Sequence, residues 1–187
     1  MKYVVFCGSN SGLSDTYREA AVALGREFTS QGIGLVFGGT TRGLMKVIAD
    51  TISAKGGELH GIIPDILVKK GQQYENLTVA EVVDTRADRR LRMAAVADGF
   101  IAMPGGLGTV EELFEMWVNA QFEGHRKPLG LYNVNGFYTQ MLKFLDTMVC
   151  EGFLPAQQRN MLVVASDPKT LLDNMRDYQP VNVSKWM

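Results

Sequence analysis

Short runs of consecutive apolar residues alternate along the chain with longer segments in which apolar residues recur every three or four positions. Unbroken apolar runs are typical of strands buried on both faces of a parallel sheet, and the wider spacing is typical of amphipathic helices. The predicted strands are residues 3–7, 33–37, 59–63, 79–83, 99–103, 129–132 and 162–165. The predicted helices are residues 14–30, 44–55, 86–97, about 110–121, 137–150 and 168–175. Residues 65–76 are polar and irregular. This order predicts a doubly wound α/β fold, a mostly parallel sheet with helices on both faces.

Composition narrows the class of protein. The 187 residues are 46% hydrophobic and 21% charged, which fits one domain spanning residues 1–187. A net charge of -1 gives no overall field for nucleic acid. Cys7 and Cys150 supply no disulfide framework, the two histidines offer no metal-ligand spacing, and no apolar run is long enough to span a membrane. We therefore expect a cytoplasmic protein without a metal, bound to neither membrane nor nucleic acid.

The most informative stretch is Pro104 to Glu112, where a predicted strand is followed by a glycine-rich turn and then a helix. Glycines allow a sharp turn, and the amides at the start of a helix favour an anion. Thr109 and Glu112 also have the spacing of a capping box, so capping is the competing explanation. It does not account for Gly105, Gly106 and Gly108 together, and we favour a phosphate-binding loop.

Two further loops follow predicted strands at the same edge of the sheet. The loop Gly8 to Gly12 lacks the spacing of a dinucleotide-binding fingerprint, and the second strand ends in Gly38-Gly39 rather than in an acid. Gly8, Ser9 and Gly39 are candidate ligand contacts. Simple turn formation is the alternative at each of these positions.

Arg86, Arg89 and Arg90 are spaced to share one face of a helix, near its N-terminus. Cations there oppose the helix dipole by about 0.3–1 kcal/mol each, and an anionic ligand would offset that. The alternative is a solvated basic face paired with Asp84 and Asp88. Arginine's planar fork matches phosphate, so we favour anion binding.

Apolar residues lie on almost every side of the predicted helix after Thr109. They are Leu113, Phe114, Met116, Trp117, Val118 and Phe122. Burial on more than one side indicates either a helix between the sheet and a partner subunit or an unusually central helix, and we favour a homodimer. His60 and His125 are expected to be structural or solvated, and no sequence pattern supports a nucleophilic triad. Physical reasoning thus reaches a phosphorylated sugar or nucleotide as ligand, with cleavage of a C–N bond as a reaction that a carboxylate could assist.

The stretch Pro104 to Glu112 resembles the PGGxGTxxE signature of the LOG (Lonely Guy) family, the cytokinin riboside 5′-monophosphate phosphoribohydrolases that are often mislabelled lysine decarboxylases. Gly38-Gly39 with Gly43-Leu44-Met45 resembles another family segment, and Arg89-Arg90 occupies the family's Arg-Lys pair. Lys127-Pro128 also matches, so the resemblance covers nearly the whole chain.

The resemblance implies a Rossmann-like homodimer that hydrolyses nucleoside 5′-monophosphates, AMP or cytokinin riboside 5′-monophosphates, without a cofactor. It makes Arg89 and Glu112 the catalytic pair. It assigns substrate binding to Arg90 and to the loop residues Gly105, Gly106, Leu107, Gly108, Thr109, Val110 and Glu111, with the amides and Thr109 on the phosphate.

This chain departs from the family pattern at several positions. Thr85-Arg86-Ala87-Asp88 stands where relatives commonly carry Met-His-Glu, Arg90 replaces a lysine, and Leu107 replaces an aromatic residue. Gly71 stands where plant members have a glutamate on the substrate side. These departures favour AMP or another nucleotide as substrate. A carrier of a phosphorylated ligand, such as a molybdenum-cofactor carrier, is the alternative function.

Overall fold

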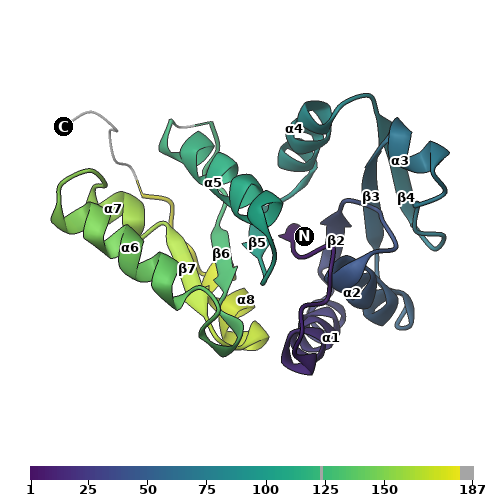
Figure 1. Ribbon diagram of the computed structural model, residues 1–187, viewed down its shortest axis with the longest axis horizontal. Helices are drawn as coiled ribbons and strands as arrows, with labels where there is room; N and C mark the ends of the chain where they lie inside the picture. The colour runs from purple at the N-terminus through teal and green to yellow at the C-terminus, as the bar shows by residue number, and fades with distance from the viewer. Residues whose placement is uncertain (123, 182–187) are drawn as a thin grey trace.

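The computed structural model describes residues 1–122 and 124–181. Within them, seven strands form one sheet in which every neighbouring pair is parallel, in the order β4-β3-β2-β1-β5-β6-β7 (Figure 1). The strands are β1 Lys2–Phe6, β2 Gly34–Phe37, β3 Leu59–Pro64, β4 Val79–Val83, β5 Gly99–Ala102, β6 Leu129–Tyr132 and β7 Leu162–Ala165. The predicted doubly wound α/β fold is confirmed.

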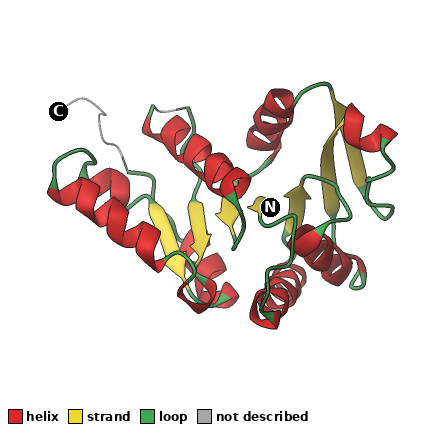
Figure 2. Ribbon diagram, viewed as in Figure 1, coloured by secondary structure: helices red, strands yellow, loops and turns green. Residues whose placement is uncertain are grey.

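Helices cover both faces of this sheet (Figure 2). They are α1 Asp15–Ser30, α2 Gly43–Ser53, α3 Asp65–Lys69, α4 Arg86–Val96, α5 Leu107–Gln121, α6 Thr139–Cys150, α7 Ala156–Arg159 and α8 Pro168–Arg176, with a 3₁₀ turn at Val134–Gly136. Two short helices, α3 and α7, were not predicted. Each is too short to show a helical period, and α3 contains no fully buried residue.

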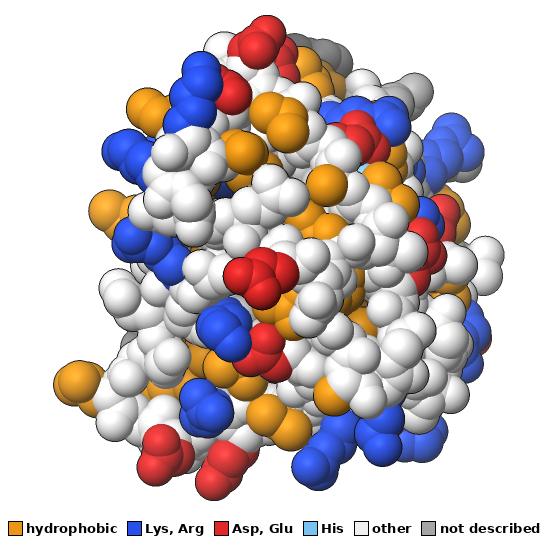
Figure 3. All heavy atoms as spheres, turned by 90° about the vertical axis from the view of Figure 1, so that its right-hand side faces the viewer, with side chains coloured by type: hydrophobic (Ala, Val, Ile, Leu, Met, Phe, Trp, Pro, Cys, Tyr) orange, Lys and Arg blue, Asp and Glu red, His pale blue; other side chains and the backbone are white. Residues whose placement is uncertain are grey.

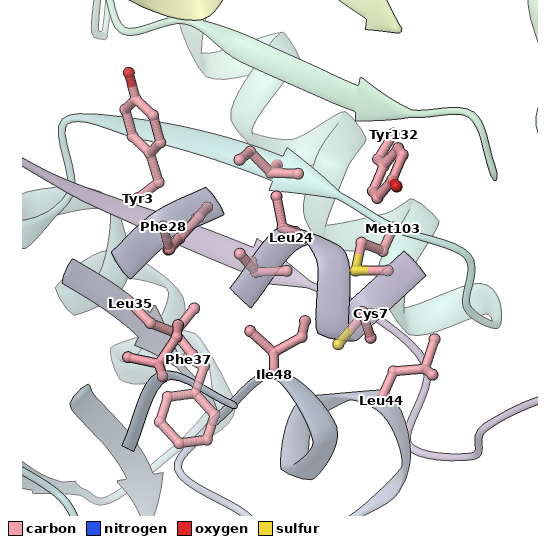
Figure 4. Close-up of a cluster of buried hydrophobic side chains, with 14 of the residues drawn as sticks. Tyr3, Cys7, Leu24, Phe28, Leu35, Phe37, Leu44, Ile48, Met103 and Tyr132 are labelled. Carbon is pink, nitrogen blue, oxygen red and sulfur yellow. The ribbon is translucent and has the colours of Figure 1, made fainter. Parts of the chain in front are cut away.

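Two apolar clusters, one on each face of the sheet, form the core. One contains α1, α2 and α8 packed on the sheet, and the other contains α4, α5 and α6. Cys7 and Met103, each next to a loop at the centre of the sheet, lie in the first cluster (Figure 4). The central strands β1 and β5 are therefore buried from both sides, as their unbroken apolar runs predicted.

The sheet reverses its winding between β1 and β5. From β1 the chain adds strands outward to β4, and then α4 brings it back to β5 on the other side of β1. Loops leave neighbouring strands in opposite directions at such a point, which opens a crevice at the carboxyl edge. Here the two loops also touch, because the Gly8 amide donates to the Pro104 carbonyl at 3.0 Å. The fold thus brings the first glycine loop against the Pro104 turn.

The capping-box explanation for Thr109 and Glu112 is wrong. Helix α5 begins at Leu107, its N-cap is Gly106, and no side chain caps it. Thr109 is already inside the first turn, so Glu112 is free of any capping role. A capping box is present instead at α4, where the Asp88 amide donates to Thr85 Oγ1 at 3.0 Å and Asp88 accepts from the Thr85 amide at 3.2 Å.

The surface turned toward the viewer in Figure 3 carries interspersed basic and acidic side chains, with apolar side chains between them. No helix in residues 1–122 or 124–181 is long and apolar enough to cross a membrane.

Candidate active site

A cavity of about 330 Å³ lies at the carboxyl edge of the sheet, where β1 and β5 meet α4 and the start of α5. The cavity is lined by residues of β1, of one side of α4 and of the first turns of α5. The lining residues are Val5, Phe6, Cys7, Ser9, Gly38, Met45, Arg86, Arg89, Met93, Gly106, Leu107, Gly108, Thr109 and Glu112. The cavity therefore sits at the position where parallel α/β sheets bind ligands.

Arg89 and Glu112 form an ion pair inside this cavity. Arg89 Nη2 donates a hydrogen bond to Glu112 Oε1, and their side chains are only 15% and 16% exposed. Burial raises the pKa of Glu112 above its ordinary value, and the nearby charges of Arg89 and Arg90 partly oppose that rise. The pair predicted as catalytic is thus brought together, and its carboxyl group is in a partly desolvated environment.

The Arg89 guanidinium retains hydrogen-bonding capacity. Its Nε is buried and has no hydrogen-bond partner among the described residues. Its Nη1 lies over Gly38, at 3.6 Å from the place a Cβ would occupy there. A buried donor without a partner is unfavourable, so a ligand with acceptor oxygens would relieve it.

The start of α5 has room for a ligand. A Cβ at Gly106 or Gly108 would meet no protein atom within 4 Å, so no neighbouring atom requires a glycine at either position. Both residues line the cavity. The amides of a first helical turn have no acceptor within the helix, and the helix dipole adds positive potential there. Open space next to such amides suits a phosphate group.

Gly105 has a different, structural role. A Cβ there would lie 2.2 Å from Thr109 Oγ1 and 2.8 Å from the Gly8 amide nitrogen. Gly105 therefore allows the turn to pack on α5 and on the first loop. It lines a smaller cavity of about 220 Å³, together with Gly8 and Ser9.

The remaining predicted contacts divide between the cavities, the core and the surface. Ser9 lines both cavities, and Thr109 is buried against the larger one. Gly39 lines neither cavity that we describe, and a Cβ there would strike Ile63 at 2.3 Å, which explains the glycine by strand packing. Val110 packs on the core. The substrate roles proposed for Gly39 and Val110 stay predictions.

Arg90 points to carboxylates rather than into the larger cavity. Its Nε lies 2.5 Å from Glu115 Oε2, an ion pair whose angle does not satisfy a hydrogen bond. Its Nη1 is 3.9 Å from Glu111 Oε1. The alternative pairing of the arginines with Asp84 and Asp88 is wrong for Arg89 and Arg90, because their partners come from α5 and Asp88 belongs to the capping box of α4.

Sequence reasoning missed several lining residues. Arg86 was predicted to bind an anion as part of the arginine cluster but was not named among the site residues, and Met45, Met93 and Cys7 were assigned to helices or to a strand without a ligand role. Burial raises the pKa of the Cys7 thiol, so it is protonated and unsuited to act as a nucleophile. The spacing of Arg86, Arg89 and Met93 along one helical face was the available signal.

Both histidines lie outside the larger cavity. His60 is 4% exposed, and its Nε2 is 2.6 Å from Glu81 Oε1. His125 Nε2 is 2.9 Å from the Met116 carbonyl oxygen, and burial lowers its pKa. Their predicted structural role is consistent with these contacts. No group of three or more His, Cys, Asp or Glu side chains that could hold a metal ion occurs in the described part of the chain.

Comparison with known proteins gives the family. Residues 45–175 match the family model described as "Possible lysine decarboxylase". A probable cytokinin riboside 5′-monophosphate phosphoribohydrolase of Oryza sativa subsp. japonica is 42% identical over 179 residues, covering 95% of this chain and 78% of that protein. The chain belongs to the LOG family. A second relative, the cytokinin riboside 5′-monophosphate phosphoribohydrolase LOG7 of Arabidopsis thaliana, is 41% identical over 94% of this chain and 81% of its own length.

Solved structures share the fold at lower identity. The molybdenum cofactor binding protein of Rippkaea orientalis superposes with a TM-score of 0.71 and 21% identity, over 94% of this chain and 95% of that one. At this level of identity the likeness is one of architecture. The solved structures therefore show the fold, and the sequence relatives show the family.

Proposed function

We propose that this LOG-family protein hydrolyses the N-glycosidic bond of nucleoside 5′-monophosphates, AMP or cytokinin riboside 5′-monophosphates, and releases the free base and ribose 5-phosphate. One observation carries the proposal: the buried Arg89–Glu112 pair shares a cavity with the unobstructed first turn of α5. A carboxylate and a phosphate site in one cavity suit the two ends of a phosphoribosyl group. The names of the relatives at about 40% identity support the same reaction.

In the proposed reaction the bond between ribose C1′ and the base nitrogen breaks, and its electron pair leaves with the base. Positive charge then develops on C1′ and the ring oxygen. Glu112, as a carboxylate in a partly desolvated cavity, would stabilise that charge or attack C1′ directly. Water supplies the hydroxyl group that ends on C1′ and the proton that ends on the base, so no cofactor is needed.

Arg89 has two roles in this proposal. Its hydrogen bond fixes the Glu112 carboxylate, and its charge keeps that carboxylate from being protonated as readily as burial alone would allow. Its unpartnered Nε is available to an oxygen of the phosphoribosyl group. Amides of Gly106, Leu107 and Gly108, with the Thr109 hydroxyl, would bind the phosphate.

The alternative function, a carrier of a phosphorylated ligand, is supported only by similarity of fold to the structural neighbours. The structural neighbours that are named for molybdenum cofactor are at most 21% identical among those compared, whereas the named phosphoribohydrolases reach 42%. A carrier would also have no need for a buried carboxylate beside its phosphate site, because that carboxylate repels the ligand. We therefore propose one function, the hydrolase.

The test is a direct assay for released base. Purified protein is incubated with AMP, with isopentenyladenosine 5′-monophosphate and with adenosine, and free base is separated by chromatography. We expect base from the two monophosphates and far less from adenosine, which lacks the phosphate. A protein that releases no base from any nucleotide, and yet binds them tightly, would be a carrier.

We also propose a cytoplasmic homodimer. Both cysteines are free, which suits a reducing compartment. Val118 on α5 is 43% exposed, and Phe144 on α6 and the nearby Phe153 are 59% and 85% exposed, so apolar surface remains beside the α5–α6 groove. Light scattering coupled to size-exclusion chromatography should give twice the chain mass. Val118→Glu should shift the protein toward monomer, and an unchanged mass would remove this surface from the interface.

A further inference from the structure

The four arginines of α4 differ in how their charge is balanced. Arg89 pairs with Glu112, Arg90 with Glu115, and Arg92 with Glu81 through Nε at 2.5 Å and Nη2 at 3.0 Å. Arg86 makes no ion pair and no side-chain hydrogen bond within residues 1–122 and 124–181. Its side chain lines the larger cavity.

Arg86 does not stabilise the fold from this position. It is the first residue of α4, and a cation there opposes the helix dipole. The capping box formed by Thr85 and Asp88 satisfies the N-terminus of α4 without it. Arg86 is exposed and borders the cavity, and an unpaired, electrostatically disfavoured cation at a cavity opening favours a ligand-binding over a structural role.

The charges that line the cavity do not cancel. Its titratable lining residues are Cys7, Arg86, Arg89 and Glu112. The Cys7 thiol is neutral because burial raises its pKa, and Glu112 offsets Arg89. Arg86 therefore supplies an uncompensated positive charge, next to the positive end of the α5 dipole.

We propose that Arg86 binds the 5′-phosphate of the substrate, together with the first turn of α5. This inference rests on the proposed function and adds a phosphate-binding side chain to it. A neutral purine offers a guanidinium no ionic partner, whereas a phosphate offers two acceptor oxygens in the geometry of the arginine fork. Arg86 shares the cavity with Leu107 and Gly108, whose amides belong to that turn.

The experiment measures binding of ribose 5-phosphate by calorimetry, which does not depend on turnover. Charge-assisted hydrogen bonds contribute enough that Arg86→Ala should weaken this binding about 10- to 100-fold. Arg86→Lys should recover part of the affinity, because lysine keeps the charge but not the fork. Arg26→Ala is the matched control, since Arg26 is an exposed arginine on α1 that does not line the larger cavity, and this variant should bind as the wild type does.

Each outcome of this experiment either supports or contradicts phosphate binding by Arg86. Wild-type affinity in Arg86→Ala, or no binding of ribose 5-phosphate to the wild type, overturns the inference. A lower melting temperature of unliganded Arg86→Ala also overturns it, because removing a cation from a helix N-terminus should not destabilise the fold. Binding that depends on Arg86 in a protein that releases no base would refute the proposed hydrolase and leave Arg86 as a phosphate ligand.

Discussion

Arg89 on α4 donates a hydrogen bond to Glu112 on α5, and both residues line a cavity together with residues of β1 and of the first turn of α5. Both side chains are more than four-fifths buried. A buried ion pair is weak evidence for stability, because desolvation of the two charges offsets much of their attraction. Its position in a cavity makes a chemical role the better explanation.

Replacing Glu112 with glutamine should remove most of the activity. Glutamine keeps the size of the side chain and can still accept a hydrogen bond from Arg89, but it carries no charge to stabilise C1′. We expect base release from AMP to fall by about 100-fold or more, since loss of one preorganised electrostatic group costs that much in other enzymes. Glu115→Gln, which removes a carboxylate paired with Arg90 outside the larger cavity, is the matched control and should retain most activity. Wild-type turnover in Glu112→Gln would return Glu112 to a structural role.

Replacing Arg89 with alanine should change the pH profile as well as the rate. The Arg89 charge lowers the pKa of Glu112 against the effect of burial, so its removal raises that pKa further. The reaction needs the carboxylate, so activity is lost as pH falls through this pKa. The acid limb of the rate profile should therefore move to higher pH in Arg89→Ala. An acid limb at the same pH would mean that Glu112 is not the group that titrates.

The raised pKa of Glu112 also predicts how stability depends on pH. A carboxyl group whose pKa is higher in the folded than in the unfolded protein stabilises the fold below its unfolded pKa. That contribution is lost as pH rises through the folded pKa. The stability of the wild type relative to Glu112→Gln should therefore fall as pH rises above about 4, the ordinary pKa of a glutamate. Urea unfolding at several pH values measures the difference, and a relative stability that rises with pH would contradict the desolvated environment of Glu112.

The two kinds of glycine in the phosphate turn should respond differently to alanine. Gly106→Ala and Gly108→Ala add a methyl group where no protein atom lies within 4 Å, so the fold should keep its melting temperature. The same methyl groups project into space that the phosphate needs, so KM for AMP should rise about tenfold or more, the effect of losing roughly one hydrogen bond to a charged group.

Gly105→Ala is the contrasting variant. Its methyl group would collide with Thr109 Oγ1 and with the Gly8 backbone, so we expect a lower melting temperature and poor expression. Equal stability of the three variants would mean that the turn adapts, and the distinction between open and packed glycines would then fail.

The fold was predictable because the spacing of apolar residues along the chain distinguishes strands from helices. The central strands β1, β2 and β5 coincide with unbroken apolar runs, which their burial from both faces requires, whereas the edge strand β4 is largely exposed and contains Glu81. The start of α5 was placed too late, because glycine has a low helix propensity and Gly108 nevertheless lies in the first turn. Thr109 and Glu112 had the right spacing for capping, but capping depends on where the helix begins.

The site was predictable only in part. Arg89 and Glu112 were named from the family motif, and their contact depends on how α4 and α5 pack, which spacing within one helix does not determine. Arg86 and Arg90 have the same charge and lie on one helical face, yet Arg86 lines the cavity and Arg90 reaches Glu115. Tertiary contacts with α5 separate them, and a single sequence contains no record of those contacts.

The Arg89–Glu112 pair lies only 23 positions apart in the sequence, within one continuous helix–strand–helix segment around β5. Gly38 and Met45, by contrast, reach the same cavity from the β2–α2 half of the sheet. The residues that line the cavity thus come from separate stretches of the chain. Substitutions in the β2–α2 half can therefore reshape this cavity while the Arg89–Glu112 contact stays intact.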